Sequence, residues 1–146
     1  MLKDLETAIG YRFENITLLQ NALTHSSYAN ERWHNSLMSN ERLEFLGDAV
    51  LELCVSEALY KAHASLSEGV LTRMRAELVC EDALSEAAKR LGLDQGIRLS
   101  VGEERSGGRS KKSILCDVME SVIGSVHLDG GREEANKLIY LAIGER

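Results

Sequence analysis

Apolar residues recur every three or four positions along most of the chain, which is the spacing that covers one face of an α-helix. No segment alternates convincingly between apolar and polar residues, as a half-buried β-strand would. The pattern therefore predicts an all-α protein without a sheet, built from about seven or eight helices. Its 146 residues suit a single compact domain, 1–146, with one hydrophobic core.

Capping residues and glycines set the expected ends of these helices. Thr17 begins TLLQ, which fits a capping box, and Ser67 and Ser113 precede two later apolar runs. Residues 25–38 lack a helical period, and residues 100–112 are rich in glycine and basic side chains, so both are expected to be loops. The expected helices cover 2–10, 17–24, 40–62 after a cap at Ser39 or Asn40, 68–79, 81–92, 114–128 and, after a turn at 129–131, 132–143.

The helix expected at 40–62 carries acids along one side of a largely apolar cylinder. At about 100° per residue, acids spaced three or four positions apart share that side. They are Glu41, Glu44, Asp48 and Glu52. Phe45, Leu51 and Val55 flank them, and a helix that is apolar nearly all round is usually buried, so we expect the acids to line a crevice. The opposite, apolar face consists of Leu43, Leu46, Val50, Leu53 and Cys54.

The helix expected at 114–128 repeats this arrangement. Asp117 and Glu120 are neighbours on a narrow polar strip, and Gly124, one turn further on, leaves room for another helix or a ligand. Neither strip carries a lysine or arginine, so a divalent cation between the two helices is the simplest way to keep these acids ionised. All-oxygen ligands favour Mg²⁺ or Mn²⁺. The spacing leaves open the alternative that both strips are solvated faces of ordinary amphipathic helices.

Composition narrows the functional classes. The chain is 44% hydrophobic and 27% charged, as in ordinary globular proteins, and its net charge of −6 argues against broad non-specific binding of nucleic acids. A nucleic-acid enzyme is still compatible, because a cation held by carboxylates reverses the local charge. The N-terminus is not a signal peptide, and no apolar run reaches the roughly 20 residues that span a bilayer. Widely spaced Cys54, Cys80 and Cys116 are interpreted as reduced, buried thiols of a cytosolic protein.

Four segments resemble the ribonuclease III family. NERLEFLGDAVL at 40–51 is similar to the family signature, and GGRSKKSILCDVMESVIGSVHLDGG at 107–131 is similar to its second catalytic segment. NALTHSSYANE at 21–31 and EGVLTRMRAELV at 68–79 also match, in the same order. The resemblance covers nearly the whole chain and implies the endonuclease domain of a bacterial ribonuclease III.

The resemblance implies a metal-dependent endoribonuclease that hydrolyses phosphodiester bonds in double-stranded RNA. Its products would carry 5′-phosphate and 3′-hydroxyl ends with short 3′ overhangs, and its role would be the processing of rRNA, mRNA and other transcripts in the cytoplasm. The implied cofactor is Mg²⁺, for which Mn²⁺ would substitute, with no small-molecule cofactor and no membrane partner. The family's usual C-terminal double-stranded-RNA-binding domain has no counterpart in these residues, so either an excised domain or a naturally short member is expected.

The motifs also assign roles to residues. Asp48 and Glu120 would be catalytic, by binding or orienting the attacking water, while Glu41 and Glu68 would support the site. The implied metal ligands are Glu44, Asp48, Asp117 and Glu120. Basic side chains are candidate contacts to RNA phosphates, with solvated surface residues as the equal alternative. They are Arg73, Arg75, Arg105, Arg109, Lys111 and Lys112.

The family works as a homodimer, so the resemblance implies a self-complementary contact in which the same patch serves both subunits. The candidates are Leu43, Phe45, Leu46 and Val50, with core packing inside one subunit as the alternative for most of them. Cys116 stands where the family usually has alanine, and His127 stands where an aromatic residue is common. Neither is a metal ligand in the family pattern.

Two other functions compete with the nuclease. A non-catalytic module for RNA binding or dimerisation would keep the fold, but it would be expected to lose acids that are all present here. A redox protein with a di-metal carboxylate site would need paired Glu-x-x-His motifs, and the single instance, Glu31 to His34, falls in a polar segment. His25 and His127 are interpreted as structural histidines.

Overall fold

The computed structural model describes residues 1–144, and every regular element in this range is helical. Within it there is no strand, and a single parallel bridge joins Thr24 to Arg98. This confirms the all-α prediction. The helices are α1 (Leu2–Ile9), α2 (Ile16–Ala22), α3 (Ser26–Trp33), α4 (Glu41–Ala62), α5 (Glu68–Leu78), α6 (Glu81–Arg90), α7 (Val101–Arg105), α8 (Lys112–Gly130) and α9 (Arg132–Ile143). Short 3-10 turns are η1 (Ser36–Met38), η2 (Leu93–Gly96) and η3 (Gly108–Ser110).

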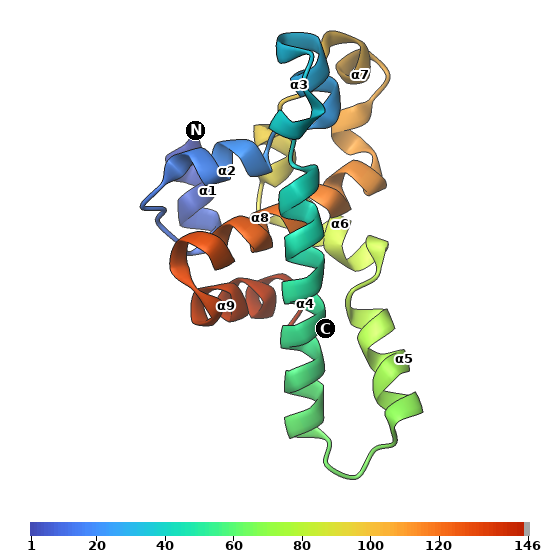
Figure 1. Ribbon diagram of the computed structural model, residues 1–146. Helices are drawn as coiled ribbons and strands as arrows, with labels where there is room; N and C mark the ends of the chain where they lie inside the picture. The colour runs from blue at the N-terminus through green and yellow to red at the C-terminus, as the bar shows by residue number, and fades with distance from the viewer. Residues whose placement is uncertain (145–146) are drawn as a thin grey trace.

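Helix α8 is the centre of the fold. It is buried almost all round, with α4 crossing one side and α6, α9 and α2 packed around the rest (Figure 1). A run of its side chains has no exposed surface, including Leu115, Met119 and Ile123. Burial of such side chains is worth about 1.5–3 kcal/mol each, so the position of α8 is fixed by the core. None of the helices in residues 1–144 is long and apolar enough to cross a membrane.

Two glycines bring α4 and α8 into direct backbone contact. A Cβ placed on Gly47 would overlap the backbone carbonyl of Glu120, and one on Gly124 would lie 2.5 Å from the carbonyl oxygen of Leu43. Gly124 was expected to admit a helix or a ligand, and the structure shows that it admits a helix. Gly47 has the matching role on α4, so both side chains must be absent for the helices to meet at this depth.

The start of α4 is also fixed from both sides. The amide of Asn40 donates to the carbonyl of Thr24 at 2.8 Å, and its side-chain amide donates to the carbonyl of Ala22 at 3.0 Å. The Ser121 hydroxyl of α8 donates to the carbonyl of Asn40 at 3.1 Å. Asn40 therefore ties α4 to both α2 and α8, although its side chain does not cap the helix as the sequence suggested.

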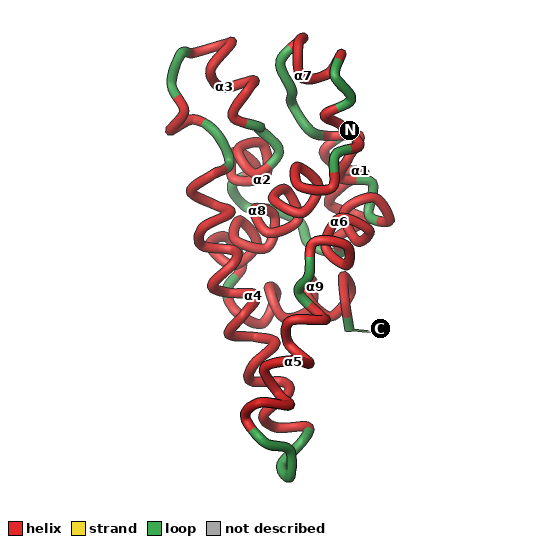
Figure 2. The backbone as a smooth tube through the Cα atoms, turned by 90° about the vertical axis from the view of Figure 1, so that its right-hand side faces the viewer, coloured by secondary structure: helices red, strands yellow, loops and turns green. Residues whose placement is uncertain are grey.

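The C-terminal half of α4 leaves the body and forms an arm with α5 (Figures 1 and 2). Helix α5 has no fully buried residue, but Leu71, Met74 and Leu78 pack partly buried against the core. Leu53 was predicted on the buried face of α4, but it is 53% exposed, because the buried face at this level is formed by Leu51, Cys54 and Val55.

Several predicted boundaries were wrong. Residues 25–38 contain α3 and η1 instead of a loop, and residues 100–112 contain α7 and η3. Helix α3 buries only Ala29, so it shows no apolar period, and its start is set by His25, whose ring nitrogen accepts from the amide of Ser27. Asn15, not Thr17, caps α2, α8 begins at Lys112 without a cap from Ser113, and α8 continues through Gly130.

Substitution of either contact glycine by alanine should destabilise the fold. Gly47→Ala and Gly124→Ala each force a methyl group into backbone atoms, and overpacking of this kind costs about 1–3 kcal/mol or more in the free energy of unfolding. Urea unfolding followed by circular dichroism measures the change. Gly69→Ala on α5 is the matched control, because a Cβ there meets no atom within 4 Å, and it should be neutral or mildly stabilising. Equal midpoints for all three variants would contradict the close contact.

Candidate metal centre

The crossing of α4 and α8 gathers the acids predicted from the sequence. The carboxyl groups of Glu44 on α4 and Asp117 on α8 share a hydrogen bond, and so do those of Asp48 and Glu120. Ligand atoms of Asp117, Glu120 and Cys116 all lie within 4.8 Å of one another. Residues that are some 70 positions apart in sequence therefore form one cluster, with one pair of acids from each helix.

The cluster is buried on its inner side and open on its outer side. Glu120 is only 8% exposed, Glu44 and Asp117 are half-buried, and Asp48 is exposed. No lysine or arginine of residues 1–144 forms an ion pair with any of them. Buried carboxylates without a cationic partner must take up a proton or bind a cation from solution.

Without a cation, these acids hold protons at unusually high pH. Burial, followed by the charge of Asp117 and the hydrogen bond to it, raises the pKa of Glu44 to about 7. Burial, followed by the hydrogen bond to Asp48, also raises the pKa of Glu120. Burial raises the pKa of Asp117, although the hydrogen bond from Glu44 opposes this effect. Burial and the neighbouring acids therefore favour the protonated forms of Glu44 and Glu120 when no cation is bound.

These residues fit a hard divalent cation. Carboxylate oxygens are the ligands that Mg²⁺ and Mn²⁺ prefer, and a cation would replace both shared protons while satisfying the buried Glu120. The outer, open side at Asp48 leaves room for the water molecules that Mg²⁺ usually retains. The geometry thus supports a site of the kind that the sequence predicts.

Two further acids lie close to the cluster. The charge of Glu41, one turn before Glu44, contributes to raising the pKa of Glu44 and of Asp117. Glu81, the first residue of α6, also raises the pKa of Asp117. No sequence pattern points to Glu81, because its proximity to Asp117 arises only from the packing of α6 on α8.

Cys116 lies beside the acids of the cluster and also packs, half-buried, against the core. Its thiol lies 3.9 Å from a carboxyl oxygen of Glu120, and burial, followed by the charge of Glu120, raises the pKa of this thiol to about 12. The sequence interpretation of three buried thiols is correct for Cys54, wrong for the exposed Cys80 and only half right for Cys116. All three are free thiols.

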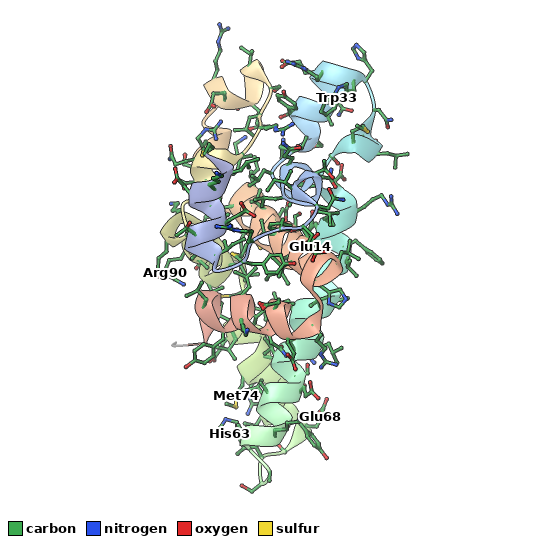
Figure 3. All side chains as sticks on the ribbon, turned by 90° about the vertical axis from the view of Figure 1, so that its left-hand side faces the viewer. Glu14, Trp33, His63, Glu68, Met74 and Arg90 are labelled. Carbon is green, nitrogen blue, oxygen red and sulfur yellow. The ribbon has the colours of Figure 1, made fainter. Side chains whose placement is uncertain are left out.

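Other predicted residues lie outside the cluster. Glu52 forms an ion pair with Arg75 of α5 at 3.9 Å, so the acidic side of α4 divides into a cluster and an isolated pair. Glu68 begins α5 on the arm, at the opposite end of the molecule from Trp33 (Figure 3), and it accepts a hydrogen bond from Thr72 at 3.3 Å. Glu31 accepts from the amide of Val101, so it forms no metal motif with His34.

Some of the basic residues predicted to contact RNA already bind groups within the chain, and others are exposed without an ion pair in residues 1–144. Lys111 and Lys112 form ion pairs with Glu103 at 2.7 Å and Asp82 at 2.9 Å. Arg109 forms an ion pair with Glu104 and donates to the carbonyls of Asp94 and Ile97 at 2.8 Å, so it fastens the glycine-rich segment. Arg75 donates to the hydroxyl of Ser56 and pairs with Glu52. Arg73 and Arg105 are exposed and have no ion pair within residues 1–144.

A family model described as Ribonuclease-III-like matches residues 15–145. The chain belongs to the ribonuclease III family. The chain is 46% identical over 141 residues to a protein named Ribonuclease 3 from Listeria innocua. The aligned region covers 97% of this chain and 62% of that protein. It is 51% identical over 139 residues to Ribonuclease 3 from Caldanaerobacter subterraneus. Here the aligned region covers 95% of this chain and 60% of that protein. The chain thus spans about three fifths of the length of these relatives.

Solved structures show the same domain. The ribonuclease III chain superposes on the nuclease domain of ribonuclease III from Campylobacter jejuni with a TM-score of 0.92 and 41% identity, covering 99% of this chain and 97% of that one. A Dicer from Pichia stipitis gives a TM-score of 0.64 with 25% identity, covering 92% of this chain and 56% of that one. The helical architecture is therefore that of ribonuclease III nuclease domains.

The metal-free ribonuclease III chain should lose stability as the pH rises. The folded-state pKa of Glu44, about 7, exceeds its ordinary value of 4.5, so the folded chain holds a proton that the unfolded chain releases in this window. The unfolding free energy therefore falls as the pH rises from about 5 to about 8, with Glu120 acting in the same direction. Thermal denaturation in EDTA across this range measures the effect.

Mg²⁺ should reverse that loss at the alkaline end, because a bound cation replaces the protons. The double variant Glu44→Gln/Glu120→Gln is the control: its melting temperature should depend less on pH and should not respond to Mg²⁺. An equally steep pH dependence in the double variant would assign the effect to other groups.

Proposed function

We propose that this chain is the catalytic domain of a Mg²⁺-dependent endoribonuclease that cuts double-stranded RNA. The observation that carries the proposal is the cluster of Glu44, Asp48, Asp117 and Glu120, which joins two helices and has no basic partner among residues 1–144. Membership of the ribonuclease III family supplies the reaction and the substrate. The products are 5′-phosphate and 3′-hydroxyl ends with short 3′ overhangs, and the role is the processing of rRNA and other transcripts in the cytoplasm.

Each acid has a defined task in this reaction. Glu44, Asp48, Asp117 and Glu120 hold the cation, which when bound acidifies a coordinated water and offsets charge on the phosphate. Asp48 is the exposed member, so substrate approaches from its side. Asp48 and Glu120 orient the attacking water and accept its proton, consistent with their shared hydrogen bond. The bond between phosphorus and the 3′ oxygen breaks, which leaves the 3′-hydroxyl and the 5′-phosphate.

A non-catalytic module with the same fold is the alternative. Such a module has no need for buried acids that raise one another's pKa, because they destabilise the folded chain at neutral pH. The retention of all four acids at the helix crossing therefore favours the enzyme. Glu41 and Glu68 are kept in supporting roles, Glu41 beside the cluster and Glu68 on the arm.

A homodimer is the second part of the proposal. Helix α4 exposes an apolar stripe in which Phe45 is 82%, Leu53 53% and Tyr60 74% exposed. Of the residues predicted for the contact, Leu43 and Val50 are buried in the core and Leu46 is partly buried, so Phe45 alone is fully available. A stripe along one helix suits an isologous contact, in which the same surface serves both copies. The Campylobacter jejuni structure is described as flexible in a region involved in dimer formation.

Loss of the catalytic acids should abolish cutting without unfolding the chain. Asp48→Asn and Glu120→Gln should each reduce Mg²⁺-dependent cleavage of long duplex RNA by at least about 10²-fold, because the water loses its proton acceptor. Gel analysis of labelled RNA measures cleavage, and circular dichroism checks the fold. Glu52→Gln, on the same helix but paired with Arg75, should cut normally. Full activity in a purified Asp48→Asn or Glu120→Gln variant would refute the assigned roles.

A charge on the α4 stripe should separate the dimer. Phe45→Glu places a carboxylate on the proposed contact, and a buried unpaired charge there costs several kcal/mol of association free energy. Analytical ultracentrifugation should show a dimer for the unchanged chain and a monomer for the variant. Leu141→Glu, at a residue of α9 that is 46% exposed, should stay dimeric. A Phe45→Glu variant that remains fully dimeric would move the contact elsewhere.

A further inference from the structure

An arginine–tyrosine patch, made of Tyr28, Arg32, Trp33 and Arg98, lies at the end of the molecule opposite the arm. The guanidinium carbons of Arg32 and Arg98 lie 5.7 Å and 5.8 Å from the centre of the Tyr28 ring. The Trp33 ring meets the same tyrosine edge-on, with ring centres 5.6 Å apart, and Trp33 is 41% exposed. Figure 3 shows Trp33 at the tip of this end.

The two arginines of the patch have no anionic partner. Among residues 1–144, neither guanidinium forms an ion pair or donates a hydrogen bond to a carboxylate. This contrasts with Arg109 and Lys111 nearby, which are neutralised by Glu104 and Glu103. The chain has a net charge of −6, so acids outnumber basic residues, yet no carboxylate of residues 1–144 pairs with either arginine. Two unpaired guanidinium groups beside one ring concentrate positive charge, and phosphate oxygens would neutralise it.

The patch is assembled rigidly from two segments. Arg98 belongs to the stretch between η2 and α7, and Arg32 belongs to α3. The hydroxyl of Ser27 accepts from the amide of Ser100 at 3.0 Å, and Glu31 accepts from the amide of Val101 at 3.2 Å. Both views of the backbone show α3 and α7 side by side (Figures 1 and 2). The arginines are therefore held together before any ligand arrives, which lowers the entropic cost of binding.

The same connections tie the patch to the acid cluster. The amide of Arg98 donates to the carbonyl of Leu23 at 2.8 Å, and the amide of His25 donates to the carbonyl of Arg98 at 3.1 Å. The neighbouring Thr24 accepts from the amide of Asn40, which precedes α4 and its acids. The patch thus lies beyond the N-terminal end of α4, on the same end of the molecule as Glu41 and Glu44.

We propose that Tyr28, Arg32, Trp33 and Arg98 form a second contact site for the phosphodiester backbone of duplex RNA, outside the metal cluster. Guanidinium groups bind phosphate oxygens as paired donors, and the stacked tyrosine holds both in place. Trp33 at the exposed edge packs against the ribose and bases of the groove. This site rests on the function proposed above. The patch would supply positive charge at one end of the bound duplex, although the domain as a whole is acidic. Arg109, Lys111 and Lys112 are less suited to this role, because acids of the chain already pair with them.

The patch carries its own reporter, because Trp33 is the only tryptophan of the chain. In EDTA, where the metal-dependent reaction is stopped, a blunt RNA duplex of about 25 base pairs should change the Trp33 emission on binding. Fluorescence anisotropy of the same labelled duplex, measured at several salt concentrations, gives the affinity and its salt slope. Circular dichroism verifies that each variant is folded.

The variant Arg32→Gln/Arg98→Gln should bind duplex RNA more weakly, and the magnitude of its salt slope should fall by about 2, since each lost phosphate contact removes about one unit. In Mg²⁺ its KM for cleavage should rise while kcat stays unchanged, because the metal cluster is intact. The matched control Arg12→Gln/Lys89→Gln loses two exposed charges that have no ion pair in residues 1–144 and should keep the full slope.

Defined outcomes separate the two proposals. An unchanged chain that binds duplex RNA through the patch but never cuts it would refute the proposed function and leave this site intact. Cleavage with equal salt slopes in both double variants, or binding without any change in Trp33 emission, would overturn the site. Preference of the patch for a phosphorylated peptide over duplex RNA would also overturn it.

Discussion

The contact between Gly47 and Gly124 is the constraint on which the site depends. Because neither residue has a side chain, the backbones of α4 and α8 touch, and the acids on the flanks of each helix meet across the contact. With larger residues at these positions, the helices would pack at the usual 8–10 Å separation, and Glu44 could not share a proton with Asp117. A feature of backbone packing thus produces the electrostatics of the cluster.

The crossing of α4 and α8 combines packing that stabilises the fold with acids that destabilise it. The core of α8 holds the helices together through many fully buried apolar side chains, while the cluster places mutually repelling carboxyl groups at the same crossing. Nearby cations are directed elsewhere: Lys111 and Lys112 pair with acids of α7 and α6, and Arg109 fastens backbone carbonyls. Within residues 1–144 the cluster therefore has no cationic partner.

Sequence reasoning captured the parts of the structure that follow from periodicity. The long helices show a clear apolar repeat, and the acid pairs at three- or four-residue spacing could be identified before the fold was known. It failed where tertiary contacts decide the outcome. Helix α3 buries one alanine and so leaves no pattern, and Leu53 lies just outside the buried face of α4, which the apolar spacing alone does not distinguish. Glu81 and Cys116 join the cluster through packing alone, and the engagement of Arg109 depends on carbonyls that no sequence pattern indicates.

The arm formed by α5 and the end of α4 is expected to be less rigid than the body of the molecule. Helix α5 has no fully buried residue and leaves an open groove between itself, α4 and α9. It is held by a capping serine, by the partly buried Leu71, Met74 and Leu78 and by Arg75. The body is stabilised by its own apolar interior. The arm has less buried apolar surface, so a surface packed against it would make it more rigid. The tip that carries Glu68 is thus the segment whose local opening costs least, and a surface that packs against it would restrict that opening.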